Sequence, residues 1–247
     1  MTNDRSKQSE QDLKLPVEAE ATPLSGDQFG ADLRGFGPVG ILAILVIILS
    51  GNVFAGNIII PIGGSLVLLW VRLSHTPWRE IGYVRPKSWI GATTAGIILG
   101  ISFKVFMKMI VLPLLGADPI NQAYHYLAGN RAMLPAALWA MIVAGFAEET
   151  VFRGFLFERF GKLFAHGAWV KALIVLLTSV LFGLAHYRVQ GLAGVEQATI
   201  VGLLFGTIFA ITGRIWILMI AHAAFDLASL AIIYLNLESD VAHLIFK

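Results

Sequence analysis

The chain has 247 residues, of which 57% are hydrophobic and only 14% are charged, and its net charge is +2. Soluble globular domains usually carry about 25% charged residues, so this composition, with a mean hydropathy of +0.75, is typical of membrane proteins. The small net charge gives no support for a nucleic-acid partner, and the lack of cysteine excludes disulfides and thiolate metal sites.

The first 34 residues differ from the rest of the chain. They contain seven acidic and four basic residues and few apolar ones, a composition that is typical of disordered segments. The basic-then-apolar layout of a signal peptide is missing. We therefore predict a disordered, acidic N-terminal tail over 1–34. It is either a regulatory or docking arm or a solvated leader, and the second interpretation is favoured.

An uncharged stretch follows between Arg34 and Arg72. A helix needs about 20 residues to cross the hydrocarbon core, so residues 35–71 predict two short membrane spans. The turn between them would fall near 50–52 or 56–57, where glycine and asparagine occur together. One span followed by a re-entrant segment is the alternative.

Five more spans are expected in the rest of the chain, 72–247, after a polar loop with interfacial tryptophans. They run from Trp89 to about Leu115 and then near 133–158, 168–187, 195–212 and 215–235. The predicted fold class is therefore all-α, a polytopic membrane bundle of about seven transmembrane helices.

The basic residues predict how this bundle is oriented. With the N-terminus inside, 13 of the 18 Lys and Arg residues lie in inner segments, three lie in outer segments and two lie in the third span. The positive-inside rule then places the N-terminus in the cytoplasm. We expect an integral, multi-pass membrane protein, and the compact chain favours the plasma membrane of a bacterium.

The two lysines inside the third span are Lys104 and Lys108, which are four residues apart. They could attract a substrate carboxylate or an anionic lipid. The preferred interpretation is that their long side chains extend along the helix to the outer interface.

Three charged residues lie together in the apolar helix near 133–158: Glu148, Glu149 and Arg153. A charge at a helix centre costs about 2.5–3.5 kcal/mol on insertion scales, so those that persist tend to be paired and functional. Glu149 and Arg153 are four residues apart, which predicts a structural ion pair. Glu148 lies about 100° away around the helix and is free for chemistry. The alternative is an ion network near the inner surface, with Glu148 reaching toward water.

Two later helices also carry polar groups. His186 closes a 14-residue run without charge that begins after Lys171, although a single histidine is more often a packed or interfacial residue. His222 and Asp226 are four residues apart on one helical face, where a carboxylate can orient an imidazole or both can bind a metal. Burial of any one of these polar groups alone in lipid would cost free energy. Their presence on three helices therefore predicts that the groups lie together in the folded bundle.

These residues form three ordered motifs: Glu148-Glu149-x-x-x-Arg153, Phe182-x-x-x-His186 and His222-x-x-x-Asp226. Together they resemble the motifs of the type II CAAX prenyl endopeptidases, also called the CPBP or Abi family of intramembrane proteases. The loop 78–83 is similar to the family's lead-in to its core helices. The resemblance covers about 72–235.

The resemblance implies an intramembrane endopeptidase, with 72–247 as a CPBP-like catalytic membrane domain and the active site inside the membrane. By position, Glu148 and His186 would activate a water, and His222 with Asp226 would hold the oxyanion. Eukaryotic members remove the last three residues of prenylated proteins. The expected partners are therefore a peptide or protein substrate, possibly lipid-modified, and the surrounding membrane lipid.

No cofactor is favoured, because a carboxylate in a low-dielectric pocket suits a general base and His222 can donate to an oxyanion. An ionised Asp226 would repel the oxyanion, so it must be protonated or act by fixing His222. This difficulty keeps an alternative open, in which Glu148, His186 and His222 ligate Zn²⁺ with a free position for water.

Two other functions compete with an enzyme. The first is a non-catalytic immunity or scaffolding protein of the same fold, which could lose His186 or His222; here every motif position is filled. The second is a proton-coupled transporter, but transporters usually show two related halves. In this chain the polar groups cluster only after residue 147.

Overall fold

The structure of the chain is a computed structural model, and it describes residues 25–51, 53–55, 58–164 and 167–246. Most of the tail predicted for 1–34 lies outside these residues. Its last ten residues differ from the prediction of disorder, because they form helix α1 (Ser25–Arg34).

A short helical hairpin follows α1. Helix α2 (Pro38–Ser50) and helix α3 (Ile62–Leu73) pack against each other, and an antiparallel pair of three-residue strands, β1 (Val53–Ala55) and β2 (Ile58–Ile60), joins them. Proline at the first position of α2 suits a helix start, since its missing N–H is not needed there. The all-α prediction therefore holds apart from the strand pair β1–β2.

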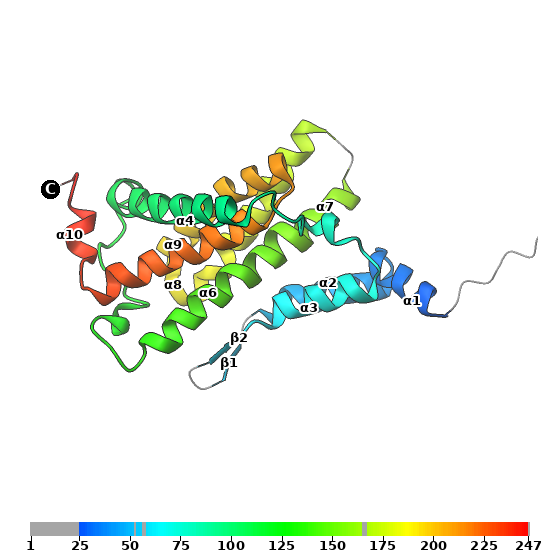
Figure 1. Ribbon diagram of the computed structural model, residues 1–247, viewed down its shortest axis with the longest axis horizontal. Helices are drawn as coiled ribbons and strands as arrows, with labels where there is room; N and C mark the ends of the chain where they lie inside the picture. Colours follow the sequence, from blue (N-terminus) through cyan, green and yellow to red (C-terminus); the bar gives the residue numbers. More distant parts are fainter. Residues whose placement is uncertain (1–24, 52, 56–57, 165–166, 247) are drawn as a thin grey trace, which may run out of the picture.

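The rest of the described chain is helical (Figure 1). Its elements are the 3₁₀ turn η1 (Trp78–Ile81), α4 (Trp89–Phe106), the π-helix η2 (Met107–Val111), α5 (Leu112–Leu114), the 3₁₀ turn η3 (His125–Leu127), α6 (Leu134–Glu149), the π-helix η4 (Thr150–Phe155), α7 (Leu156–Leu163), α8 (Ala168–Thr212), α9 (Trp216–Tyr234) and α10 (Glu238–Ala242).

Four continuous helices in the described residues are long and apolar enough to cross a membrane, and a fifth is counted if α1 and α2, bent by 57°, form one span. The predicted bundle of membrane helices is confirmed, but the number seven is not reached. One reason is that α2 and α3 have only 13 and 12 residues, fewer than the roughly 20 that a span needs. The two short spans predicted for 35–71 correspond to these two helices, each of which is shorter than a full span.

The second reason is that α8 contains two of the predicted spans. Its 45 residues are interrupted at Gly191, where φ is 61° and ψ is −155°. A left-handed φ suits glycine, because in other residues the Cβ clashes with the backbone at this angle. The chain thereby breaks between the predicted spans 168–187 and 195–212, and His186 lies one turn before the break.

Helix α9 lies at the centre of the bundle, between α4 and α6 (Figure 1). Two glycines allow these contacts. A Cβ on Gly100 of α4 would lie 2.1 Å from the carbonyl oxygen of Ala221, and one on Gly145 of α6 would lie 2.6 Å from the backbone nitrogen of Ala223. Small residues of this kind let membrane helices approach closely. The two contacts flank His222 and bring α6 directly against it.

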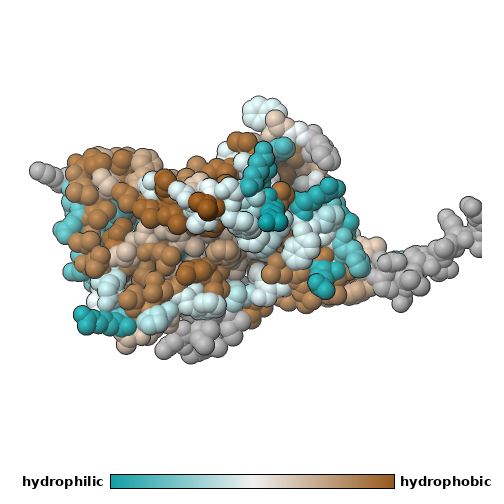
Figure 2. Space-filling view, viewed as in Figure 1, coloured by the Kyte–Doolittle hydropathy of each residue, from teal (hydrophilic) through white to brown (hydrophobic). Residues whose placement is uncertain are grey.

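The two ends of the bundle are polar, and the visible face between them is largely apolar (Figure 2). At the end that carries α1, Glu80 of η1 accepts from Arg34 at 2.9 Å and pairs with Lys162 of α7 at 3.0 Å. Burial, which raises the pKa of Glu80, is outweighed by these two cations, so its pKa lies below the usual value. The loop 78–83 thus links α1 to α7 through the ion pairs of Glu80.

Candidate active site

The site is built around the end of α6. This helix runs to Glu149 and continues without a break into η4, where the wider π turn begins. Such π turns occur often at functional sites. The hydroxyl of Thr150 donates to the carbonyl of Phe146 and lies 2.8 Å from the hydroxyl of Tyr83. The lead-in loop therefore contacts the helix directly beside the two glutamates.

The structure brings the four predicted catalytic residues together. The Oε2 atom of Glu148 lies 4.0 Å from Nε2 of His186 and 3.7 Å from Nε2 of His222. The same nitrogen of His222 lies 3.7 Å from Oδ2 of Asp226. All three distances exceed a direct hydrogen bond, so a water or a substrate atom can lie between these groups.

The carboxylate of Glu149 contacts both His222 and Arg153. Its Oε1 atom accepts from Nη1 of Arg153 at 2.8 Å and lies 2.8 Å from Nδ1 of His222. All three side chains are almost completely buried. The ion pair expected between Glu149 and Arg153 is present, but the contact with the imidazole was missed. No sequence signal indicates it, because Glu149 and His222 are 73 residues apart.

The spacing of His222 and Asp226 had suggested that this aspartate orients the imidazole. In the structure Glu149 makes the short contact to Nδ1, while Asp226 faces the opposite nitrogen, Nε2. Asp226 therefore lies on the side of the ring that faces Glu148. Two carboxylates thus flank the nitrogen that is free for a substrate.

His186 is fixed by its own helix. Its Nδ1 atom lies 2.8 Å from the carbonyl oxygen of Phe182, one turn earlier in α8. A carbonyl only accepts, so Nδ1 must donate, and in the neutral ring Nε2 is left as an acceptor. This nitrogen points toward Glu148. A water between them can donate one proton to each.

Phe182 links the parts of the site. Its ring contacts both imidazoles edge-on, with centroids 4.7 Å from His186 and 5.7 Å from His222, and Arg153 lies over it at 4.6 Å. The motif around His186 therefore supplies a packing surface in addition to the histidine. The side chains of Glu148, His186 and Asp226 are 21%, 20% and 21% exposed, whereas that of His222 is only 5% exposed.

Tyr124 in the loop before η3 lies next to this face and was not predicted. Burial raises its pKa to about 12, and the negative charges of Asp226 and Glu148 act in the same direction. The amide of Gln190 lies 3.5 Å from the hydroxyl. The Tyr124 hydroxyl therefore stays protonated at neutral pH and can donate near the two carboxylates.

The groups named for the alternative zinc site are spaced more widely than the ligands of a tetrahedral zinc ion. Ligands about 2.0–2.2 Å from a tetrahedral zinc ion lie about 3.4 Å from one another, whereas Glu148 is 4.0 Å and 3.7 Å from the two histidines. No group of three His, Asp or Glu side chains in the described parts of the chain could hold a metal ion as it stands.

Lys104 and Lys108 are covered by other parts of the protein, which the preferred interpretation of the sequence did not anticipate. They are only 4% and 6% exposed. Lys104 donates to Gln197 of α8, and Lys108 donates to the carbonyl of Pro119 in the loop after α5. The periodicity of α4 could not show that α8 and this loop cover the two side chains.

Comparison with known families gave a match for the second half of the chain. Residues 130–228, which include all four predicted catalytic residues and the Glu149–Arg153 pair, match the family model described as type II CAAX prenyl endopeptidase Rce1-like. Comparisons with the curated proteins and with the solved structures gave no match. Residues 130–228 of this membrane protein are therefore similar to the type II CAAX prenyl endopeptidases.

Proposed function

We propose that the protein is an intramembrane endopeptidase in which Glu148 and His186 activate a water without a metal ion. The observation that carries the proposal is the meeting of Glu148, His186 and His222 from three helices, with Oε2 of Glu148 at 4.0 Å and 3.7 Å from Nε2 of the two histidines. The match to a protease family supports the same reaction class.

The water would donate one proton toward Oε2 of Glu148 and the other toward Nε2 of His186. Glu148 acts as the general base: it takes a proton while the oxygen attacks the carbonyl carbon of the peptide. The protonated carboxyl then transfers this proton to the leaving nitrogen as the C–N bond breaks. A carboxylic acid and an amine are released, and Glu148 returns to its starting state.

His222 would stabilise the oxyanion. Since Nδ1 faces the carboxylate of Glu149, Nε2 can donate to the substrate when the ring carries both protons. The three carboxylates around the ring supply the negative charge that this form requires. One preorganised donor to an oxyanion contributes about 10²–10³ in rate. Asp226 would act by holding the charged ring, which avoids direct contact between its carboxylate and the oxyanion.

The test is cleavage of internally quenched peptides, with and without a prenyl group, by the purified full-length chain. We expect the wild-type protein to cleave at least one of them. The variants His186→Ala and His222→Ala should lose cleavage and elute as folded monodisperse protein in detergent. Full activity in both variants would show that this cluster is not the active site.

We expect chelators such as EDTA and 1,10-phenanthroline to leave the cleavage rate unchanged, because the candidate ligands are too far apart for tetrahedral zinc. Metal analysis of the active protein checks this directly. One equivalent of zinc that tracks activity, and activity that returns when zinc is added back, would favour the zinc mechanism instead.

We further propose that the end of the bundle with α1, η1 and α7 faces the cytoplasm of a bacterial cell. Basic residues from three segments gather there, among them Arg34 and Lys162 on the two sides of Glu80. The positive-inside rule favours this orientation. The loop that contains Tyr124 and the helix α10 would then lie on the outer side, and the substrate would be a peptide or a lipid-modified protein in the same membrane.

A further inference from the structure

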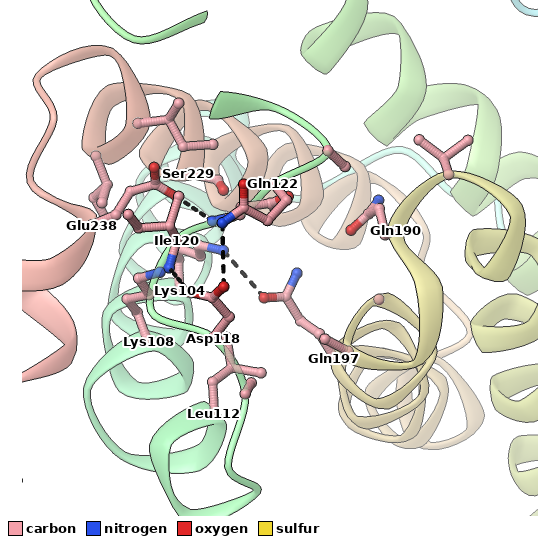
Figure 3. A pocket seen from close by; sticks show the side chains of 18 residues that line it. Lys104, Lys108, Leu112, Asp118, Ile120, Gln122, Gln190, Gln197, Ser229 and Glu238 are labelled. Atoms are coloured by element: carbon pink, nitrogen blue, oxygen red, sulfur yellow. Dashed lines mark hydrogen bonds between the residues drawn. The ribbon is translucent and has the colours of Figure 1, made fainter. Parts of the chain in front are cut away.

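A cavity of about 280 Å³ lies between the loop after α5, the part of α8 around Gly191, the end of α9 and helix α10. This volume is close to the lower end of the range of about 300–1,000 Å³ that is usual for ligand pockets. Lys104 of α4 and Lys108 of η2 line the cavity, and Figure 3 shows Lys104 facing Gln197 of α8 across it. The proposed reaction assigns the cavity no part.

The two lysines are buried without an anionic partner. None of the ion pairs within the described residues includes Lys104 or Lys108. Lys104 donates to the side-chain oxygen of Gln197, and Lys108 donates to the carbonyl of Pro119. An ammonium group has three donors, so both lysines have hydrogen-bonding capacity left. Buried charges are normally paired, so this side of the cavity is suited to an anionic group.

Two acidic residues line the same cavity, and the loop holds both of them. Glu238 of α10 accepts from the backbone N–H of Asn121 at 2.8 Å, and its other oxygen lies 2.9 Å from Nδ1 of His125. Asp118 accepts from the backbone N–H of Ile120, which is the main reason that the pKa of Asp118 is lowered. An ionised carboxylate offers about four acceptor sites. Both carboxylates can therefore accept further hydrogen bonds from a cationic group.

The positive and the negative side chains of the cavity lie at different levels of the bundle. Lys104 and Lys108 belong to the helical segment Trp89–Leu114, which is long and apolar enough to cross a membrane. Asp118 lies in the loop that follows this segment, and Glu238 lies in α10, beyond the end of α9. The cavity therefore has two cations on its membrane side and two carboxylates on its loop side. A purely anionic ligand would satisfy only the lysines, whereas a zwitterion can satisfy both sides.

One edge of the cavity is formed by exposed apolar residues of α8. Val189 and Ala193 line the cavity and are exposed, and Leu192 between them is 65% exposed. Helix α8 is itself apolar enough to lie in a membrane, so this edge would face lipid. A ligand can thus place a charged group in the cavity while its hydrocarbon chains extend along α8.

We infer that this cavity binds the headgroup of phosphatidylethanolamine, a zwitterionic lipid whose phosphate is followed by a primary ammonium group. The phosphate, which is nearer to the acyl chains, would accept from Lys104 and Lys108. The ammonium group, which is farther from them, would donate to Asp118 and Glu238. The order of the charges along the headgroup is the order in which the cavity presents their partners. This site is separate from the proposed reaction and does not depend on it.

The first experiment measures lipid binding to the full-length chain in detergent by native mass spectrometry, and thermal unfolding with the same lipids. The probes are dioleoyl phosphatidylethanolamine, phosphatidylcholine and phosphatidylglycerol. Phosphatidylcholine keeps the positive charge but has no N–H donor, and phosphatidylglycerol has no cationic group. Charge-assisted hydrogen bonds are strong enough to predict that phosphatidylethanolamine binds about 10-fold more tightly than either of the others. It should also give the largest rise in unfolding temperature.

Variants test the two sides of the cavity separately. Lys104→Met and Lys108→Met should each weaken binding of phosphatidylethanolamine by about 10-fold, because the phosphate loses a charged donor. Asp118→Asn can still accept from Ile120, so the loop should keep its structure. It should bind phosphatidylethanolamine and phosphatidylcholine with nearly equal affinity. The matched control is Lys171→Met, an exposed lysine at the start of α8, which should keep the wild-type preference.

Four results would overturn the inference. The first is equal binding of the three lipids by the wild-type protein. The second is a preference for phosphatidylethanolamine that persists in Asp118→Asn and in lysine variants whose unfolding matches the wild type. The third is tighter, lysine-dependent binding of phosphatidylglycerol, which would make the cavity a simple anion site. The fourth is equally tight binding of glycerophosphoethanolamine, which has no acyl chains and would assign the cavity to a soluble phosphate ester.

Discussion

Glu148→Gln is expected to lower the rate of peptide cleavage by about 10²–10⁴-fold, the contribution of a general base. Glutamine has the shape of glutamate but cannot accept the proton of the attacking water. The substitution should leave the stability of the fold unchanged, because the closest partners of the Glu148 carboxylate are at 3.7 Å and no short contact is lost. Single-turnover cleavage of a quenched peptide and thermal unfolding in detergent measure the two effects separately.

The matched control is Asp240→Asn, which removes one carboxylate from the exposed surface of α10. It should cleave the peptide at the wild-type rate. If Glu148→Gln also kept that rate, Glu148 would not be the base, and the proposed mechanism would have to be abandoned. A Glu148→Gln protein that binds but does not cleave would also serve to trap physiological substrates.

Glu149→Leu is expected to cause the largest loss of stability, because it leaves Arg153 charged and unpaired in the protein interior. Arg153 is 1% exposed and Glu149 is fully buried. Removing one partner of such a pair typically costs about 3–5 kcal/mol. The change also removes the group that holds Nδ1 of His222, so cleavage should be lost as well.

The double variant Glu149→Leu/Arg153→Met separates the two effects. Replacement of a whole buried ion pair by apolar residues is often neutral or stabilising, so thermal unfolding should return close to the wild type. Cleavage should stay low, because His222 is still without its partner. If cleavage recovered together with stability, Glu149 would have only a structural role and the orientation of His222 would not depend on it.

Much of the bundle could be predicted because membrane-spanning helices can be recognised from the hydropathy of the sequence alone. Long uncharged runs of about 20 residues indicate spans whatever their neighbours are. The helices from Trp89 onward agree with the predicted ranges, except that α8 contains both spans predicted for 168–187 and 195–212. The region 35–71 is also uncharged, but its division into two short helices and a strand pair depends on how they pack. Gly64 of α3, for example, lies against Ala147 of α6, so closely that a Cβ would be 2.9 Å from that residue.

The candidate site could be predicted in part for a similar reason. Charged and polar groups cost free energy in an apolar helix. Glu148, His186, His222 and Asp226 could therefore be recognised as unusual without knowledge of their positions in space. Polar residues in loops cannot be recognised in this way, because they are ordinary there. Tyr124 could therefore not be recognised, although Asp226 and Glu148 both act on its hydroxyl.

The sequence by itself determined that this protein is a helical membrane protein and which of its polar residues had to be paired, because hydropathy and cost of burial depend on residue type alone. Only the tertiary structure decided which residues these polar groups contact. It placed Glu149, rather than Asp226, on Nδ1 of His222, and it enclosed Lys104 and Lys108 in a cavity. Helical spacing relates residues within one helix, whereas these contacts depend on how α4, α6, α8 and α9 pack together.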